Sequence, residues 1–420
     1  MLGIQRGVLT MTLRAPFHFD IVGSFLRPDR LKEARAHFAR GEIAALDLKQ
    51  VEDEEIAQLI ERQKAAGLHT LTDGEFRRSY WHLDFFWGFQ GITHIELEQG
   101  YLFHGEETAR GTAIVTGKIS GKDHPFVEHF KYVKGFEDEN TLARQTLPAP
   151  AQLLAELYRG NNGKITDAVY PDREALLQDI AAAYRQVFRD LYEAGCRNIQ
   201  LDDCTWGMFC DTEYWNKRQK GAVSLKEIAE EYLRLNNLAL EGHPADLAIT
   251  THVCRGNYHS TWAARGGYGP IAPLLFGKEN VDAFYLEFDD ERSGGFEPLK
   301  EVAPRKQVVL GLITTKRPEL EDRDQVIARI HEAAKYVPLE NLCLSPQCGF
   351  ASCEIGNKLT EAEQWAKLAL VRSIAQEVWG GIKEGGVARC VQHPLAVEPR
   401  SGSSLESEVW SRMLNLHANF

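Results

Sequence analysis

The chain has 420 residues, a hydrophobic content of 44% and a formal net charge of −12. This length is enough for one barrel-sized domain or two smaller domains, and the composition is ordinary for a globular protein. The negative charge argues against nucleic acid or an anionic membrane as the main partner, and no run of about 18 apolar residues predicts a membrane span.

The chain begins with a mixed stretch, residues 1–16, that lacks the apolar centre of a signal peptide, and we interpret it as a flexible leader. Eight cysteines are too few for a disulfide scaffold in a chain of this length. We therefore expect a reducing, cytoplasmic location, where thiols bind metals, catalyse or pack.

Short apolar runs alternate with amphipathic helical stretches along most of the chain. The runs predict strands at 19–22, 68–71, 142–147, 198–201, 247–251, 283–286, 308–313 and 342–344. Apolar residues at helical spacing predict helices at 174–194, 323–336 and 362–378, and capping boxes at 224–227 and 360–363 predict helix starts. The alternation predicts an α/β fold, and eight repeats favour a (β/α)8 TIM barrel over a doubly wound open sheet.

Two segments fall outside this repeat. Residues 84–140 are rich in glycine and aromatic residues, and we interpret them as an insertion after the second strand, with a β-hairpin that covers the barrel mouth. Residues 380–420 contain glycine, serine and proline clusters and a short helical stretch, and we interpret them as a C-terminal extension. The barrel itself is then a single domain, residues 17–379.

Residues that bind metals follow three of the predicted strands. His252 and Cys254 follow the fifth strand, Glu287 ends the sixth, and Cys348 follows the eighth. In a TIM barrel these ends lie on one rim, where active sites are built. Zinc accepts nitrogen, sulfur and oxygen ligands in tetrahedral geometry, so the four side chains form a candidate zinc site. The alternative is that both thiols are core residues and His252 is a hydrogen-bonded loop residue.

A second thiol set, Cys343, Cys348 and Cys353, has a spacing of five residues. Cys343 lies within an apolar run, and by the alternation of side chains along a strand it faces the opposite side from the residues at the strand end. We therefore interpret Cys343 as a packing residue.

The motifs at the strand ends resemble the catalytic domain of cobalamin-independent methionine synthase. They occur in the same order along residues 17–379, and the similarity is closer to single-domain bacterial methionine-synthase-like or homocysteine methyltransferase proteins. The motifs are Gly23-Ser24, Asp73-Gly74-Glu75, Asp202-Asp203, His252-Val253-Cys254, the strand ending in Glu287, and Ser345-Pro346-Gln347-Cys348.

The resemblance implies a methyltransferase that acts on a thiol. It implies Zn²⁺ as the cofactor, held by His252, Cys254, Glu287 and Cys348. It also implies that homocysteine receives a methyl group from 5-methyltetrahydrofolate or its polyglutamate, and that homocysteine is held by Gly23, Ser24, Glu75 and Asp202. Without the motifs, Glu75 and Asp202 are better read as structural salt-bridge residues at the rim.

One loop departs from the family. The loop after the seventh predicted strand, residues 311–318, contains no histidine, although the family has one there that can act as a general acid. Lys316 is our candidate for this catalytic role. Because this loop lacks the histidine, other donors are alternatives to the methyl-folate: a methyl-corrinoid protein, another methyl donor, or an epoxide. A non-catalytic binding or regulatory barrel is the alternative from a different class.

Overall fold

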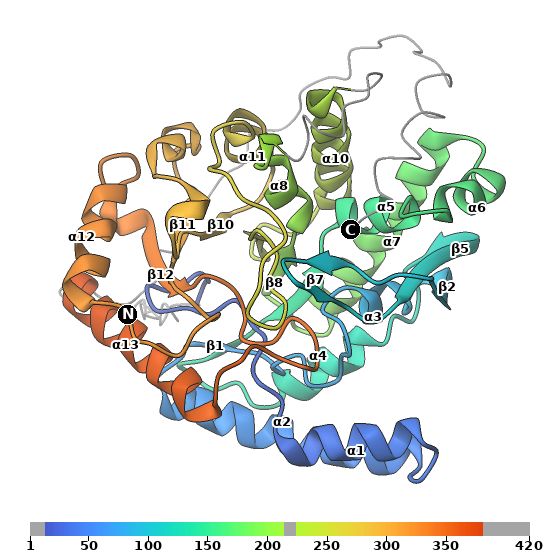
Figure 1. Ribbon diagram of the computed structural model, residues 1–420, viewed down its shortest axis with the longest axis horizontal. Coiled ribbons are helices and arrows are strands. Elements are labelled where there is room, and N and C mark those ends of the chain that lie inside the picture. The colour runs from blue at the N-terminus through green and yellow to red at the C-terminus, as the bar shows by residue number, and fades with distance from the viewer. Residues whose placement is uncertain (1–12, 214–223, 381–420) are drawn as a thin grey trace, which may run out of the picture.

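The structure is a computed structural model that describes residues 13–213 and 224–380 (Figure 1). Most of the predicted leader, residues 1–16, and nearly all of the predicted C-terminal extension, residues 380–420, lie outside the described residues. The last part of the leader is described and packs on the barrel, since Ala15 is buried and Arg14 forms an ion pair of 3.0 Å with Asp282.

Parallel strands form the centre of the molecule. Six of them pair in chain order: β7 (Gln145–Pro148), β8 (Asn198–Asp202), β9 (Ala248–Val253), β10 (Ala283–Glu287), β11 (Gln307–Ile313) and β12 (Leu342–Pro346). Two short strands, β1 (Thr70–Leu71) and β6 (Leu142–Ala143), form a separate parallel pair, and β6 lies directly before β7 in the chain. The first predicted strand is reduced to one parallel bridge, from Phe19 to Leu344 of β12. The predicted α/β TIM barrel is confirmed.

Helices cover the outside of the sheet (Figure 1). The long helices are α1 (Asp29–Ala39), α2 (Ala45–Ala65), α7 (Arg173–Glu193), α10 (Leu225–Leu240), α12 (Arg323–Ala333) and α13 (Glu361–Trp379). The shorter ones are α3 (Leu83–Phe86), α4 (Phe126–Lys134), α5 (Pro150–Leu157), α6 (Asn162–Val169), α8 (Cys204–Phe209) and α11 (Ala272–Lys278). Both predicted capping boxes are present, with Ser224 before α10 and Thr360 before α13.

The interior of the barrel contains a buried ion pair. Arg144 Nη2 lies 3.0 Å from Asp20 Oδ2, and it also donates to Tyr285 Oη at 2.6 Å. Because Asp20 follows the Phe19 bridge and Arg144 joins β6 to β7, this pair ties the start of the barrel to its third strand. Cys343 is fully buried beside Tyr285 and Val309, in agreement with its predicted packing role.

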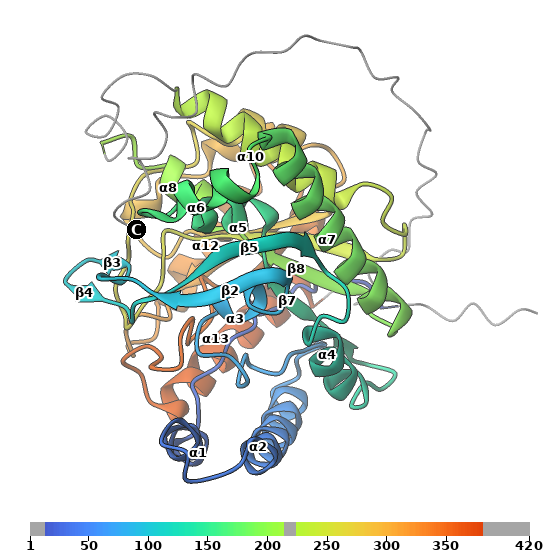
Figure 2. The same cartoon turned by 90° about the vertical axis from the view of Figure 1, so that its right-hand side faces the viewer.

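A β-hairpin lies between β1 and β6 in the chain. Strand β2 (Gln90–Glu96) pairs antiparallel with β5 (Gly111–Ser120), and the short strands β3 (Leu102–Phe103) and β4 (Glu106–Glu107) pair at its far end. Figure 2 shows β2 and β5 side by side, with β3 and β4 extending beyond them. At this end His104 N donates to Trp262 O at 3.0 Å, so the hairpin reaches the loop after β9.

None of the helices in the described ranges is both long enough and apolar enough to span a lipid bilayer.

Candidate metal centre and its cavity

The carboxyl ends of the strands bring the predicted site residues to one rim. Asp202 ends β8 and pairs in register with His252 of β9, and Glu287 ends β10. Cys254 directly follows β9, and Cys348 lies two residues after β12. Asp203 N donates to His252 O at 2.8 Å, which fixes the backbone that bears the imidazole.

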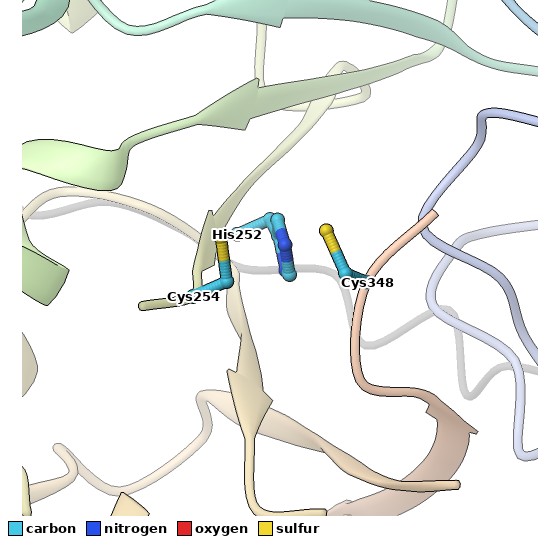
Figure 3. A group of neighbouring side chains, drawn as sticks. All are labelled: His252, Cys254 and Cys348. Carbon is cyan, nitrogen blue, oxygen red and sulfur yellow. The ribbon is translucent and has the colours of Figure 1, made fainter. Parts of the chain in front are cut away.

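Three of the four predicted metal ligands lie together. One nitrogen of His252 and the sulfurs of Cys254 and Cys348 lie within 4.8 Å of one another, and all three residues are buried. Figure 3 shows the imidazole between the two sulfurs, with His252 and Cys254 from one strand end and Cys348 from the other side. Neither ring nitrogen of His252 has a hydrogen-bond partner outside the group, and the side chain that acts on it is Cys254. A buried imidazole whose neighbours are two thiols has the chemistry of a zinc site.

The thiol of Cys254 lies in a setting that favours the thiolate. Hydrogen bonds from Cys204 and Cys348 hold the pKa of Cys254 well below its usual range, and they outweigh the opposing effect of burial. Thiolates, not thiols, bind metal ions.

Glu287, the fourth predicted ligand, is not part of this group. Its Oε1 accepts hydrogen bonds from Arg292 Nη2 at 2.6 Å and Lys316 Nζ at 3.3 Å. Its Oε2 accepts from Arg255 N at 2.5 Å. Burial raises the pKa of Glu287, but the cations Lys316 and Arg292 outweigh it, so the net shift is downward and the carboxylate stays ionised.

Lys316, the candidate acid, is bound to carboxylates. Its Nζ lies 3.3 Å from Glu287 Oε1 and 3.1 Å from Asp289 Oδ2. Burial lowers the pKa of Lys316, but the two carboxylates raise it by more, so the ammonium is held in its charged form. The structure does not place Lys316 among the residues that line the cavity described next.

A cavity of about 120 Å³ opens beside the metal group. His252, Cys254 and Cys348 line it, as do three of the four predicted homocysteine residues, Ser24, Glu75 and Asp202. Much of the remaining wall is aromatic and comes from the hairpin, the rim loops and helices α8 and α10: Tyr80, Trp81, Tyr101, Phe103, Phe209, Tyr232 and Tyr258. The cavity is thus lined by both ionisable and aromatic side chains.

Glu75 is held in a strained turn. It adopts a positive φ of 62°, and its backbone N donates to Asp73 Oδ1 at 2.8 Å. Its Oε1 accepts from Thr146 Oγ1 at 3.0 Å and forms an ion pair with Arg78 Nη1 at 3.3 Å, whereas its Oε2 is buried and has no hydrogen-bond partner. Burial raises the pKa of Glu75. A residue other than glycine in the left-handed region costs free energy, and such residues cluster at functional sites.

Asp202 is a second buried carboxylate at the same cavity. Gln200 Nε2 donates to its Oδ1 at 2.9 Å. Burial raises the pKa of Asp202 to about 7, against the opposing effect of His252. Two buried carboxylates that line one cavity have the chemistry to bind a cation such as an ammonium group.

Gly23 and Ser24 lie where the barrel closes. Gly23 has a φ of 143°, and a Cβ there would lie 2.7 Å from Thr146 Cγ2. Ser24 packs against the loop after β12: Phe350 N donates to Ser24 O at 3.0 Å, and a Cβ on Gly349 would lie 1.8 Å from Ser24 Oγ. Ser24 is therefore fixed next to Cys348.

Sequence reasoning missed one thiol at the site. Cys204 begins α8 and lines the cavity, and its Sγ lies 3.6 Å from Cys254 Sγ. The signal was present, because Asp203 lies two residues after the predicted strand at 198–201 and is a typical helix N-cap residue; its side chain accepts from Thr205 N at 3.0 Å. A helix that starts at a strand end places its first side chains on the rim.

A buried polar network that joins the hairpin to helix α5 was also missed. His82 Nε2 lies 3.0 Å from Tyr101 Oη, and Tyr101 donates its proton to Glu156. Nε2 must therefore carry the imidazole proton, which leaves Nδ1 as an acceptor without a partner. Burial lowers the pKa of His82 to about 3, so the ring stays neutral.

Comparison with known proteins gives the family. The family model described as "Cobalamin-independent synthase, Catalytic domain" matches residues 18–377. The chain belongs to this family. The resemblance inferred from the motifs is thereby confirmed, and the family is one of enzymes.

Three relatives show the range of similarity. The protein printed as "Uncharacterized protein YxjG" of Bacillus subtilis is 42% identical over 367 residues, which cover 87% of this chain and 96% of that protein. A crystal structure of a vitamin-B12-independent methionine synthase-like protein from Listeria monocytogenes is 39% identical, with a TM-score of 0.69, and covers 88% of this chain and 100% of its own. A "Methionine synthase" of Saccharolobus solfataricus is 24% identical over 334 residues, 78% of this chain and 86% of its own.

Proposed function

We propose that this protein is a zinc-dependent methyltransferase that transfers a methyl group to the thiol of homocysteine to form methionine. One observation supports this most directly: the His252, Cys254 and Cys348 group opens onto the same cavity as Glu75 and Asp202. A thiol-activating group and an ammonium-binding pair at one cavity match a substrate that has a thiol at one end and an amino group at the other.

His252, Cys254 and Cys348 would hold the zinc ion. When bound, zinc lowers the pKa of a thiol and so supplies a nucleophile at neutral pH. The burial of all three residues keeps water away from the reacting sulfur and strengthens the electrostatic effect of each charge.

Glu75 and Asp202 would bind the ammonium group of homocysteine. The free Oε2 of Glu75 is the acceptor for one N–H, and the ionised form of Asp202 is favoured once a cation lies beside it. Backbone groups at Gly23 and Ser24 would receive the substrate carboxylate at the closure of the barrel.

We propose 5-methyltetrahydrofolate, or its polyglutamate, as the methyl donor, on the basis of family membership. A different donor, such as a methyl-corrinoid protein, another methyl donor or an epoxide, is the second candidate. The observation in its favour is that Lys316, our candidate acid, is bound to Glu287 and Asp289 instead of facing the cavity. In the proposed mechanism Lys316 therefore positions Glu287.

Two measurements test the proposal. Purified protein should contain about one zinc per chain, and homocysteine should be methylated by at least one member of a donor panel led by 5-methyltetrahydrofolate. Absence of bound zinc, or of transfer from every donor, would refute the proposal.

A variant tests the substrate end separately. Glu75→Gln should weaken homocysteine binding about 10- to 150-fold, since hydrogen bonds to charged groups contribute about 1.5–3 kcal/mol. Zinc content should not change. Glu55→Gln is the matched control, because Glu55 is buried but pairs with Arg30 away from the cavity. Equal binding by both variants would remove Glu75 from the ammonium site.

A further inference from the structure

One buried side chain that lines the cavity plays no part in the proposed metal and homocysteine sites. His82 directly precedes helix α3, lines the cavity and is only 4% exposed. Its Nδ1 has no hydrogen-bond partner among the described residues. A buried acceptor without a partner costs free energy, and such groups are rare in folded proteins. Nδ1 is thus available to a molecule that enters the cavity.

A chain of hydrogen bonds fixes which nitrogen of His82 is the acceptor. Burial raises the pKa of Tyr101, so the phenol keeps its proton, and Tyr101 donates this proton to Glu156. His82 Nε2 lies 3.0 Å from Tyr101 Oη and must then be the donor, so Nδ1 bears the lone pair. Because burial lowers the pKa of His82 to about 3, the ring is neutral and cannot protonate a ligand at neutral pH.

The far end of this chain is held on several sides. Glu156 of α5 also accepts a hydrogen bond from Thr112 of β5 and pairs with Arg159 at 3.5 Å. The guanidinium carbon of Arg159 lies 3.5 Å from the centre of the Tyr101 ring. Because the two opposite charges are paired inside the wall, this side of the cavity offers a neutral acceptor in a fixed position.

A second group without a partner lies on helix α5. Gln152 precedes Glu156 by one helical turn and lines the same cavity, and its buried Oε1 has no hydrogen-bond partner in the described part of the chain. Trp81 lines the cavity beside His82, with ring centres 4.5 Å apart, and is only partly buried. Aromatic faces favour flat rings, and the two acceptors favour N–H groups. This wall therefore fits a neutral, flat nitrogen heterocycle.

The proposed reaction brings two substrates into this one cavity. Ser24, Glu75 and Asp202, which belong to the proposed homocysteine site, line it as well. Because the methyl group must come within bonding distance of the homocysteine sulfur, the donor shares the cavity during transfer. His82 and Gln152 are not used by the homocysteine site, so they are left for the donor.

We propose that His82 binds the methyl donor, with Nδ1 accepting a hydrogen bond from an N–H group of a neutral, flat nitrogen heterocycle that carries the methyl group. The proposal rests on the proposed function and adds a residue that selects the donor. Tyr101 and Glu156 are positioning residues, since they act by holding the Nε2 side of the imidazole. 5-Methyltetrahydrofolate fits this description, because the ring system that bears its methyl group also carries N–H groups.

Two substitutions separate the two ring nitrogens of His82. The amide nitrogen of glutamine reaches the position of Nε2, so His82→Gln keeps the bond to Tyr101 and loses the acceptor at Nδ1. The amide oxygen of asparagine reaches the position of Nδ1, so His82→Asn keeps the acceptor and loses the bond to Tyr101. In methyl-transfer assays His82→Gln should raise the KM for 5-methyltetrahydrofolate about 5- to 150-fold, the cost of an unpaired hydrogen-bonding group in a buried site. The KM for homocysteine should not change, and His82→Asn should recover most of the loss.

The matched control is His124→Gln. His124 is also a buried histidine of the inserted segment, but both of its nitrogens have partners, Phe85 O at 2.9 Å and Phe126 N at 3.2 Å, and it does not line the cavity. This variant should leave both KM values unchanged. A purely structural role of His82 predicts the opposite order, with His82→Asn more impaired than His82→Gln, and that order would overturn the proposal. An equal rise in the donor KM of the control would also overturn it.

A second measurement uses only the wild-type chain, in case a variant does not fold. In protein labelled with ¹⁵N-histidine, one ring nitrogen without a proton should change its resonance when 5-methyltetrahydrofolate is added to the homocysteine complex, because it accepts a new hydrogen bond. An unchanged histidine spectrum with the donor bound would overturn the proposal.

The two proposals fail in different ways. Wild-type protein that transfers no methyl group to homocysteine from 5-methyltetrahydrofolate, methylcobalamin or S-adenosylmethionine would refute the proposed function. Transfer from methylcobalamin or S-adenosylmethionine alone would overturn the role of His82, since neither carries its methyl group on a neutral, flat heterocycle, and would leave the thiol half of the proposed function standing.

Discussion

Replacement of Lys316 by methionine tests whether this residue is part of a buried charge cluster. Its Nζ lies 3.1–3.3 Å from Asp289 and Glu287, and the side chains of the three residues are 9%, 2% and 0% exposed. At an effective dielectric constant of about 20, each contact contributes about 5 kcal/mol of attraction, which the cost of burying the lysine largely offsets. Removing the lysine leaves the two buried carboxylates with less positive charge beside them, although Arg292 still lies 2.6 Å from Glu287 and 3.8 Å from Asp289. Breaking a buried pair in this way costs about 3–5 kcal/mol.

We therefore expect Lys316→Met to lower the free energy of unfolding by about 3 kcal/mol. The assay is urea unfolding of metal-free protein, followed by circular dichroism. Lys358→Met is the control, because Lys358 also pairs with a glutamate, Glu106, at 3.0 Å, but its side chain is 54% exposed. The control should show no measurable change, since exposed pairs contribute little. Equal losses in the two variants would refute the argument from burial.

Three further predictions concern pH, packing and metal. Burial lowers the pKa of His124 to about 4, so the unfolded chain binds the proton first and the free energy of unfolding falls as the pH drops from about 6.5 to 4. In urea titrations His124→Gln should flatten this slope by about 1.4 kcal/mol per pH unit relative to the wild-type protein, and an unchanged slope would contradict the argument. A Cβ at position 349 would lie 1.8 Å from Ser24 Oγ, so Gly349→Ala should lower the free energy of unfolding by about 1–3 kcal/mol. Thermal melts should show partial recovery when Ser24→Gly is added, and purely additive effects of the two substitutions would contradict this. A chelator should lower the melting temperature, with recovery on adding zinc; an unchanged melt would speak against a bound metal.

The sequence was sufficient to predict the barrel and the positions of the rim residues. Strand ends could be predicted because buried parallel strands are apolar runs and the polar residues after them mark the rim. His252, Cys254 and Cys348 follow that logic, and the structure brings them together. The first strand was over-predicted: an apolar run at 19–22 is compatible with a strand, but only Phe19 forms a bridge to β12.

The partners of individual side chains could not be read from the sequence. Glu287 was placed at the correct strand end, yet its partners Arg292 and Lys316 come from a rim loop and from the end of the next strand. The contact between Cys204 and Cys254 joins residues 50 positions apart, and it depends on how closely α8 approaches the loop after β9. Such choices are made by tertiary packing, for which local periodicity has no signal.

The contact between Ser24 and Gly349 has a consequence for substrate length. Ser24 belongs to the proposed carboxylate end of the site, and Gly349 directly follows Cys348, a proposed metal ligand. Because the two chain segments touch at this point, the span from the carboxylate pocket to the sulfur pocket is rigid. If homocysteine binds as proposed, this fixed span would select for substrate length: cysteine, which is one methylene shorter, would not reach both ends at once. Selection for the length of the substrate would then follow from the contact between the first and last segments of the barrel.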